Sequence, residues 1–209
     1  MQKSGKYAII KKSRLRGGET VVRYVFRSER LYYLAADPAL AARTAAFYHR
    51  NRSAFAPFDP VQPEEFFTAE GQRERLEWDM SQAEEGRCFR FLLVRPRQPG
   101  KIVGLAGLNE IVRGAFQSCF LSYKVDHTLW GQGYGSEAID AVTGWGFRTL
   151  GLHRVEANIM PRNLASRRAA EKAGFWEEGL SRHYLKISGR WEDHLHLVRL
   201  NEEDMDGRT

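Results

Sequence analysis

The sequence predicts an α/β fold in which helices flank a mixed, mostly antiparallel sheet. Three strand-like runs, residues 88–95, 101–111 and 116–125, follow one another with short turns between them, which is typical of an antiparallel meander. A glycine-rich loop comes next. Strand-like and helix-like segments then alternate before a long closing hairpin with Ser188-Gly189 at its tip. Together these observations favour one sheet sandwiched between helices.

The half of the chain before the meander is predicted to be mainly helical after short N-terminal strands. A glycine pair at residues 17–18 suits the turn between the first two strands. Asp37 is a suitable N-cap for a helix that reaches about Arg50, because its carboxylate can accept from the first backbone N–H groups. Three prolines make residues 51–63 a predicted loop, and residues 64–85 have a helical composition.

Side-chain periodicity assigns faces to the elements around the glycine-rich loop. Residues 116–125 and 153–160 both alternate, so each strand has two distinct faces. Helices are predicted at residues 136–150 and 164–173, and each is followed by a glycine. One face of the first strand holds Cys119, Leu121, Tyr123 and Val125, and the polar face of the second holds Arg154, Glu156 and Asn158.

We expect one domain at residues 29–200, preceded by a basic β-hairpin extension at residues 1–28 and followed by a polar tail at residues 201–209. Residues 1–30 carry nine Lys or Arg against two Glu, and their net charge of 9 − 2 = +7 exceeds the +6 of the whole chain. Such a basic segment can attract phosphate, and ribosomal or other RNA is one candidate partner. A solvated hairpin that aids solubility explains the same charge equally well.

Several classes of protein are excluded by composition. No apolar run approaches the ~20 residues that a membrane helix needs, and the basic N-terminus lacks the apolar stretch of a secretory signal. We therefore expect a cytoplasmic protein without membrane contact. Cys88 and Cys119 lie in apolar strand-like runs, which predicts buried, reduced thiols. His194 and His196 have no visible third ligand, so no metal site is expected.

Residues 130–136, Trp-Gly-Gln-Gly-Tyr-Gly-Ser, join a strand to a helix and are typical of an anion site. Glycines let a ligand approach the backbone, and a helix N-terminus offers unpaired N–H groups to a pyrophosphate. A tight turn without any ligand has the same composition. A Walker A loop would need Gly-Lys-Ser/Thr, which is absent. A dinucleotide fingerprint would need its third glycine one residue later, in a loop that opens a βαβ unit.

The same loop resembles the pyrophosphate loop of the GNAT acetyltransferase superfamily, whose pattern is R/Q-x-x-G-x-G/A. Trp130, Gly133 and Gly135 occupy the three marked positions, and Trp130 departs from the Arg/Gln preference. Residues 162–166 and 171–175 are similar to the N-x-x-S/A and K-x-G-F parts of the helix that lies beside the CoA arm in that family.

A closer resemblance, to the bacterial ribosomal-protein-alanine N-acetyltransferases, is carried by three further segments. They are residues 109–119, 153–163 and 184–194. The resemblance extends from about Glu29 to the C-terminus, and residues before Ser28 have no counterpart. It implies the GNAT acyl-CoA N-acyltransferase fold for the domain at residues 29–200.

The resemblance implies that acetyl-CoA is the co-substrate. It assigns Val125 and His127 as backbone contacts near the pantetheine. The pyrophosphate would be cradled by Gln132, Gly133, Tyr134, Gly135 and Ser136. Asn163 and Ser166 would touch the CoA arm, although Asn163 also suits a helix N-cap without any ligand.

The implied reaction transfers acetyl to a primary amine, so the amine must lose a proton and the leaving thiolate must be stabilised. By the resemblance, Ser166 is the candidate that steers or protonates the thiolate, and Tyr184 is its rival. Glu156, acting through a water, is the candidate base, with Glu110 as the alternative. An ion pair with Arg154 would explain Glu156 without catalysis, and a solvated turn would explain Glu110.

The resemblance implies that the acceptor is the N-terminal amine of a ribosomal or other protein. A small-molecule amine or a lysine is an alternative with the same chemistry. A ribosome-associated RNA-binding or assembly protein without turnover is an alternative of a different class. A protein terminus needs an open groove near the late hairpin, whereas a small amine needs a closed pocket.

Overall fold

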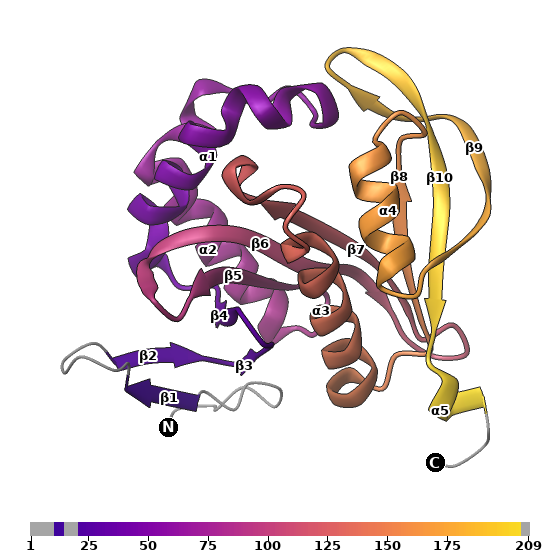
Figure 1. Cartoon of the computed structure of the whole chain (residues 1–209), viewed down its shortest axis with the longest axis horizontal. Coiled ribbons are helices and arrows are strands. Elements are labelled where there is room, and N and C mark those ends of the chain that lie inside the picture. Colours follow the sequence, from indigo (N-terminus) through magenta and orange to yellow (C-terminus); the bar gives the residue numbers. More distant parts are fainter. Residues whose placement is uncertain (1–10, 15–20, 206–209) are drawn as a thin grey trace.

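The computed structural model describes residues 11–14 and 21–205 and confirms the predicted α/β fold (Figure 1). One eight-stranded sheet has the order β3-β4-β5-β6-β7-β8-β10-β9, and all its neighbouring strands are antiparallel except β7 and β8. The strands are β3 (Phe26–Arg27), β4 (Tyr32–Ala35), β5 (Phe89–Arg95), β6 (Gln98–Val112), β7 (Ser118–Val125), β8 (Arg154–Ile159), β9 (Trp176–Ile187) and β10 (Arg190–Leu200).

Helices cover both faces of the sheet, and each face has its own apolar core. α1 (Ala41–Phe55) and α2 (Ala69–Glu84) pack on one face through a cluster that includes Phe47, Leu76 and Leu92. α3 (Tyr134–Leu150) and α4 (Leu164–Lys172) pack on the other through a larger cluster. The shorter helices are η1 (Pro38–Leu40), η2 (Ala56–Phe58), η3 (Glu64–Phe67), η4 (His127–Leu129) and α5 (Glu202–Met205).

The predicted N-terminal hairpin is present as β1 (Lys11–Arg14) and β2 (Val21–Tyr24), which form a separate two-stranded antiparallel sheet. The turn expected at residues 17–18 lies outside the described residues. Val25 is buried, and the ring of Phe26 stacks on Trp145 at a centroid distance of 5.9 Å. Packing of the main core therefore crosses the predicted domain boundary at residue 28.

Two helix starts follow from side-chain caps. The carboxylate of Asp37 accepts from the N–H of Ala39 at 2.9 Å, as the sequence predicts. α2 begins after Thr68, whose hydroxyl accepts from the Gly71 N–H at 3.1 Å and caps the helix. Each of these caps replaces a bond that the first turn of a helix lacks.

One prediction about an irregular segment is wrong. The loop predicted at residues 51–63 begins too early, because α1 continues to Phe55. Asn51 and Phe55 are both buried against the rest of the fold, so tertiary packing extends the helix beyond its local signals. The segment predicted as a polar tail contains the one-turn helix α5 near its start.

The only parallel pair in the large sheet separates partway along its length. β7 and β8 are in register at Ser118–Arg154, Cys119–Val155 and Phe120–Glu156 only, although β7 continues to Val125 and β8 to Ile159. Beyond Phe120 the side of β7 that faces β8 has no strand partner among the described residues. A gap in the sheet thus opens toward the carboxyl ends of both strands.

No described helix is both long and apolar enough to cross a membrane.

Candidate active site

The glycine-rich loop leads into the N-terminus of α3. Gly133 is the residue before the helix, with φ of 81°, a conformation that favours glycine. The first intrahelical bond runs from the N–H of Glu137 to the carbonyl of Gly133 at 3.1 Å. The N–H groups of Tyr134, Gly135 and Ser136 therefore precede the helical ladder and can bind an anion.

Arg30, which the sequence analysis missed, braces this loop from a segment more than 100 residues away. Its Nε donates to Oε2 of Glu137 at 2.6 Å, and its Nη1 donates to the Gln132 carbonyl at 2.9 Å. Its guanidinium also lies 4.2 Å from the centroid of the Tyr134 ring. A Cβ on Gly133 would lie 3.3 Å from Arg30 Nη2, so the loop and its brace are closely fitted.

Trp130, the departure from the family pattern, has a structural role. Its indole Nε1 donates to the Val125 carbonyl at 2.8 Å, so the side chain fastens the loop to the end of β7. The N–H of His127 donates to Oδ1 of the buried Asn51 at 2.8 Å. Both residues predicted to contact pantetheine through their backbone thus already have one backbone group engaged, and those contacts stay predictions.

A buried carboxylate fixes the corner between β7 and η4. Oδ2 of Asp126 accepts from Nε of Arg50 at 2.7 Å, and its Oδ1 accepts from the Thr128 hydroxyl at 2.8 Å. Burial alone would raise the pKa of Asp126, but the hydrogen bonds from Arg50 and Thr128 outweigh it and lower the pKa to about 2. Asp126 and Asn51 tie α1 to the start of the loop.

The first turn of α4 places Ser166 against β7. Oδ1 of Asn163 accepts from the Ser166 N–H at 3.2 Å, which is the N-cap arrangement that the sequence also allows. The Ser166 hydroxyl lies 2.7 Å from the phenol oxygen of Tyr123. Burial raises the pKa of Tyr123 to about 12 even though the bond with Ser166 opposes the shift. Tyr123 was assigned only to a strand face by its sequence, because its partner comes from a distant helix.

On the opposite face of the sheet, Glu156 lies within a polar cluster of β8, β9 and β10. Its Oε2 accepts from Nη2 of Arg154 at 3.0 Å, and its Oε1 lies 2.6 Å from Nδ1 of His196. Burial raises the pKa of Glu156, but the hydrogen bonds with His196 and Arg154 outweigh it, and the net shift is downward. The carboxylate is therefore ionised and is a weak direct base.

His196 extends this cluster to a hydroxyl. Its Nε2 lies 2.7 Å from Oγ of Ser181 on β9, so Glu156, His196 and Ser181 form a continuous hydrogen-bonded chain. Sequence analysis excluded His196 as a metal ligand but gave it no role, since its partners lie on other strands. This chain can carry a proton, because the imidazole and the hydroxyl can each accept and donate while the ionised Glu156 accepts from Nδ1 of His196.

Tyr184 belongs to the same cluster. Its hydroxyl accepts from Nδ2 of Asn158 at 3.2 Å, and its ring packs 5.1 Å from the ring of His196. Burial raises the pKa of Tyr184, and the charges of Glu156 and Glu110 raise it further. Glu110 is exposed and has φ of 50°, within the stretch where the pairing of β6 with β7 shifts register.

His194 is buried and packs against the ring of Tyr184. Within residues 11–14 and 21–205, no group of three His, Cys, Asp or Glu side chains could hold a metal ion. Both cysteines are free and buried, as the sequence predicts.

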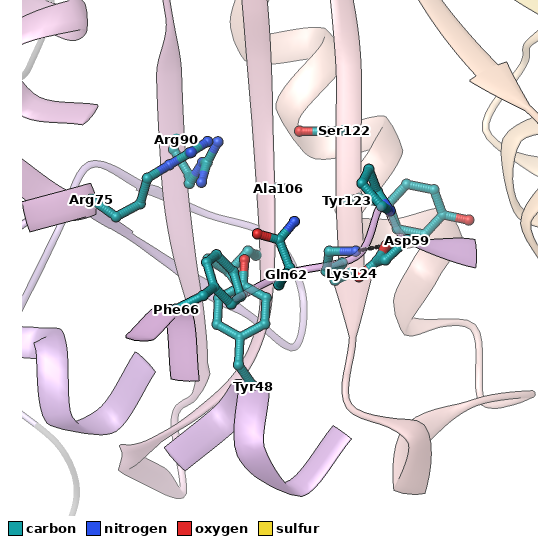
Figure 2. A pocket seen from close by; sticks show the side chains of 12 residues that line it. Tyr48, Asp59, Gln62, Phe66, Arg75, Arg90, Ala106, Ser122, Tyr123 and Lys124 are labelled. Atoms are coloured by element: carbon teal, nitrogen blue, oxygen red, sulfur yellow. Dashed lines mark hydrogen bonds and ion pairs between the residues drawn. The ribbon is translucent and has the colours of Figure 1, made fainter. Parts of the chain in front are cut away.

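A cavity of about 220 Å³ opens on the α1 and α2 face (Figure 2). Its walls come from both helices, from the loop between them and from the middle of the sheet. The lining residues that matter for charge are Asp59, Gln62, Arg75, Arg90, Ser122 and Lys124. Lys124 and Asp59 form an ion pair across one end of this cavity. None of the predicted site residues lines it.

The gap between β7 and β8 joins these features into one site. The free N–H groups at the start of α3, a candidate anion cradle, lie at one end of the gap, the hydroxyl pair of Tyr123 and Ser166 lies on one face, and the hydrogen-bonded chain of Glu156 and His196 lies on the other. A thioester in the gap would meet groups on both faces. The fold and this site define the class of acyl-CoA-dependent N-acyltransferases.

Comparisons with known proteins agree with that class. The family described as Acetyltransferase (GNAT) domain matches residues 28–176, and the chain belongs to this family. It is therefore an acyltransferase of the GNAT fold, with acetyl-CoA as its co-substrate.

Two relatives and one solved structure are informative. Over 180 residues the chain is 34% identical to the probable N-acetyltransferase YjcK of Bacillus subtilis, covering 86% of this chain and 99% of that protein. It is 35% identical to the [ribosomal protein uS5]-alanine N-acetyltransferase of Escherichia coli, covering 78% and 84% respectively. The ribosomal-protein-S5-alanine acetyltransferase of Vibrio fischeri superposes with a TM-score of 0.81 at 30% identity, covering 85% of this chain and 97% of that one.

Proposed function

We propose that this enzyme transfers acetyl from acetyl-CoA to the N-terminal amine of a protein, with a ribosomal protein as the first candidate. The observation that carries the proposal is the gap between β7 and β8, which gives access to one thioester from both faces of the sheet. The similarity to two ribosomal-protein-alanine acetyltransferases supports the choice of acceptor. A ribosomal acceptor would place the reaction in the cytoplasm.

Binding of the donor rests on backbone groups. The N–H groups of Tyr134, Gly135 and Ser136 would hold the pyrophosphate, with the adjoining backbone of Gln132 and Gly133. Gly135 lies close to the hydroxyl pair, since an added Cβ would be 3.5 Å from both Tyr123 and Ala169. Val125, His127 and Asn163 would line the course of the pantetheine.

The acetyl transfer needs one proton acceptor and one proton donor. The amine nitrogen attacks the thioester carbonyl carbon, the C–N bond forms and the C–S bond breaks. We assign the His196 imidazole as the acceptor of the amine proton. Glu156 holds the imidazole at Nδ1, and the Ser181 hydroxyl, bonded to Nε2, links it to the gap. The Ser166 hydroxyl, which is bonded to Tyr123, steers the leaving thiolate by a hydrogen bond, and the thiolate takes its proton from water. Tyr184 orients the acceptor beside this chain.

The placement of the late hairpin supports a protein acceptor. The tip of β9 and β10 reaches the segment after α1, where the Ser188 hydroxyl donates to the Ala56 carbonyl at 2.8 Å (Figure 1). Arg162 adds a contact to the ring of Phe58, with 5.7 Å between its guanidinium carbon and the ring centroid. A peptide would enter beside this contact and lie along the polar face of the sheet.

The proposal is tested by incubating the full chain with labelled acetyl-CoA and three matched acceptors. These are a peptide with a free α-amine and no lysine, the same peptide with a blocked α-amine and one lysine, and a small primary amine. We expect label in the first alone. Label in the second or third alone would assign the acceptor to lysine or to a small molecule.

The basic extension at residues 1–28 stays a separate proposal. It would bring the enzyme to RNA through its positive charge, and binding would then weaken steeply as salt is raised. Residues 1–10 and 15–20 lie outside the described residues. A salt titration of the chain with and without residues 1–24, against a structured RNA, measures that contribution.

A further inference from the structure

Two arginines converge at one end of the cavity shown in Figure 2. Arg75 comes from α2 and Arg90 from β5, and their Nε atoms lie 3.7 Å and 3.5 Å from the carboxylate oxygens of Asp79. Asp79 is fully buried, and its oxygens make no hydrogen bond. Because these separations are too long for hydrogen bonds, Asp79 offsets part of the charge of the two arginines without occupying their N–H donors.

The two guanidinium groups therefore keep donors for a ligand. Among the described residues, Asp79 is the only ion-pair partner of either arginine, and neither has a hydrogen bond to the chain. The Arg90 side chain is only 14% exposed, so much of its hydration shell is already lost. Two like charges with unfilled donors in a partly dry cavity favour a planar oxyanion, because guanidinium forks match a carboxylate bidentately.

The opposite end of the cavity has, within the described part of the chain, no unpaired charge that would favour an oxyanion. Lys124 is neutralised by Asp59, and Ser122 is bonded to Nδ2 of Asn109 at 2.9 Å. Positive charge that is free to bind a ligand is thus concentrated at Arg75 and Arg90. The rings of Tyr48 and Phe66, whose centroids lie 4.6 Å apart, form an apolar part of the wall.

The sheet connects this end of the cavity to the gap. Arg90 is in register with Gly107 on β6, and Gly107 is in register with Ser122 on β7. Gly107 has no side chain, so none stands between Arg90 and Ser122 in this row, and an added Cβ would lie 2.9 Å from the Phe89 carbonyl oxygen. Two inter-strand spacings separate Arg90 from β7, a distance of about 10 Å, which is the length of about three extended residues.

We infer that Arg75 and Arg90 form a carboxylate subsite for the acceptor, so that the enzyme prefers a protein terminus with Asp or Glu at its second or third residue. The inference rests on the proposed function and adds the acceptor's chemistry to it. The amine lies at the gap, the backbone of the acceptor crosses above Gly107, and the acidic side chain pairs with both guanidinium groups.

The test compares kcat/KM for peptides that differ at one position. Glu, Gln or Lys is placed at residue two, three or six behind an N-terminal alanine, and free glutamate serves as a small acceptor. We expect Glu at residue two or three to exceed Gln by about tenfold, and no difference at residue six. Equal rates for Glu and Gln at every position would overturn the inference while leaving the proposed function intact. Failure to acetylate any peptide would instead overturn the proposed function, and use of free glutamate in place of peptides would overturn the peptide subsite.

Variants at Arg75 link the preference to this site. Arg75 is chosen because its side chain is 42% exposed and its loss leaves Arg90 beside Asp79, so the fold should tolerate the change. We expect Arg75→Gln to erase most of the preference for Glu, Arg75→Lys to keep part of it, and Arg75→Glu to favour Lys at the same position. Arg73→Gln, on the same helix and paired only with Glu70, is the matched control. An unchanged preference in Arg75→Glu with an unaltered Tm would refute the assignment.

Discussion

The two faces of the sheet at the gap are built in different ways. On the α3 and α4 face, the cradle consists of backbone N–H groups from consecutive residues at one helix start. On the α1 and α2 face, Glu156, His196, Ser181, Arg75 and Arg90 come from five different elements. A site built from local backbone tolerates changes in many side chains, whereas a site assembled from distant side chains depends on each of them.

The largest effect is expected where a side chain blocks the backbone cradle on the α3 and α4 face. Gly133→Glu should weaken acetyl-CoA binding by about 100-fold or more, because a carboxylate would lie at the anion site on a backbone with φ of 81°. Isothermal titration with acetyl-CoA measures the affinity. Gly189→Glu has nearly the same φ, 82°, and open space around its Cβ, so it controls for backbone strain alone. Equal losses in both variants would contradict the cradle.

The next largest effect is expected on the α1 and α2 face, where the site is assembled from distant side chains. Glu156→Gln should lower kcat/KM by about 100-fold at pH 6 and by less at pH 9, because at pH 9 most of the amine is already neutral before it attacks. Steady-state rates across this range give the profile. Glu178→Gln removes the other carboxylate bonded to Arg154, at 2.7 Å, without touching His196. A loss that is the same at every pH, or the same in both variants, would indicate a structural role for Glu156.

A smaller effect is expected for the two side chains that the α3 and α4 face contributes. Tyr123→Phe and Ser166→Ala should each lower kcat by about tenfold with little change in the KM for acetyl-CoA, since one bond of 2.7 Å joins the two hydroxyls. Because they act as a unit, the double variant should lose little more than either single one. Additive losses in this double-mutant cycle would show that the two hydroxyls act independently.

The smallest effect on turnover, but a measurable one on stability, is expected at the corner between the faces. The folded pKa of Asp126, about 2, lies below its unfolded value, so its contribution is present above pH ~4 and is lost as pH falls through about 2. Asp126→Asn should therefore lower the free energy of unfolding by about 2 kcal/mol at pH 7 and by progressively less toward pH 2. Urea unfolding at both ends of this range tests it, with the exposed Asp140→Asn as control. A pH-independent difference would contradict the linkage.

Predictions from the sequence succeeded where the signal is local. The alternating strand at residues 153–160, the helix that follows the glycine-rich loop, and the hairpin around Ser188-Gly189 are all present within a few residues of their predicted bounds. The Asp37 cap is present as well. The loop predicted from residue 51 failed because the burial of Asn51 and Phe55 depends on elements distant in sequence.

The candidate site divides in the same way. Gly133, Gly135 and Ser136 could be proposed from the chain alone, since glycines and a helix start are consecutive there. Arg30, Tyr123 and His196 could not, because their partners Glu137, Ser166 and Glu156 lie from 40 to more than 100 residues away. The residues lining the Arg75 and Arg90 cavity had no sequence signal at all.

By itself, then, the sequence determined the order of helices and strands and the family, and it predicted a backbone cradle for a pyrophosphate. Periodicity, caps and glycines act over a few residues and remain legible in a linear chain. Only the tertiary structure decided that Glu156 is an ion-paired anchor for His196, that Tyr123 bonds to Ser166, and that two arginines meet above Asp79. These pairings depend on strand register and on how the two strands separate, which no local pattern specifies.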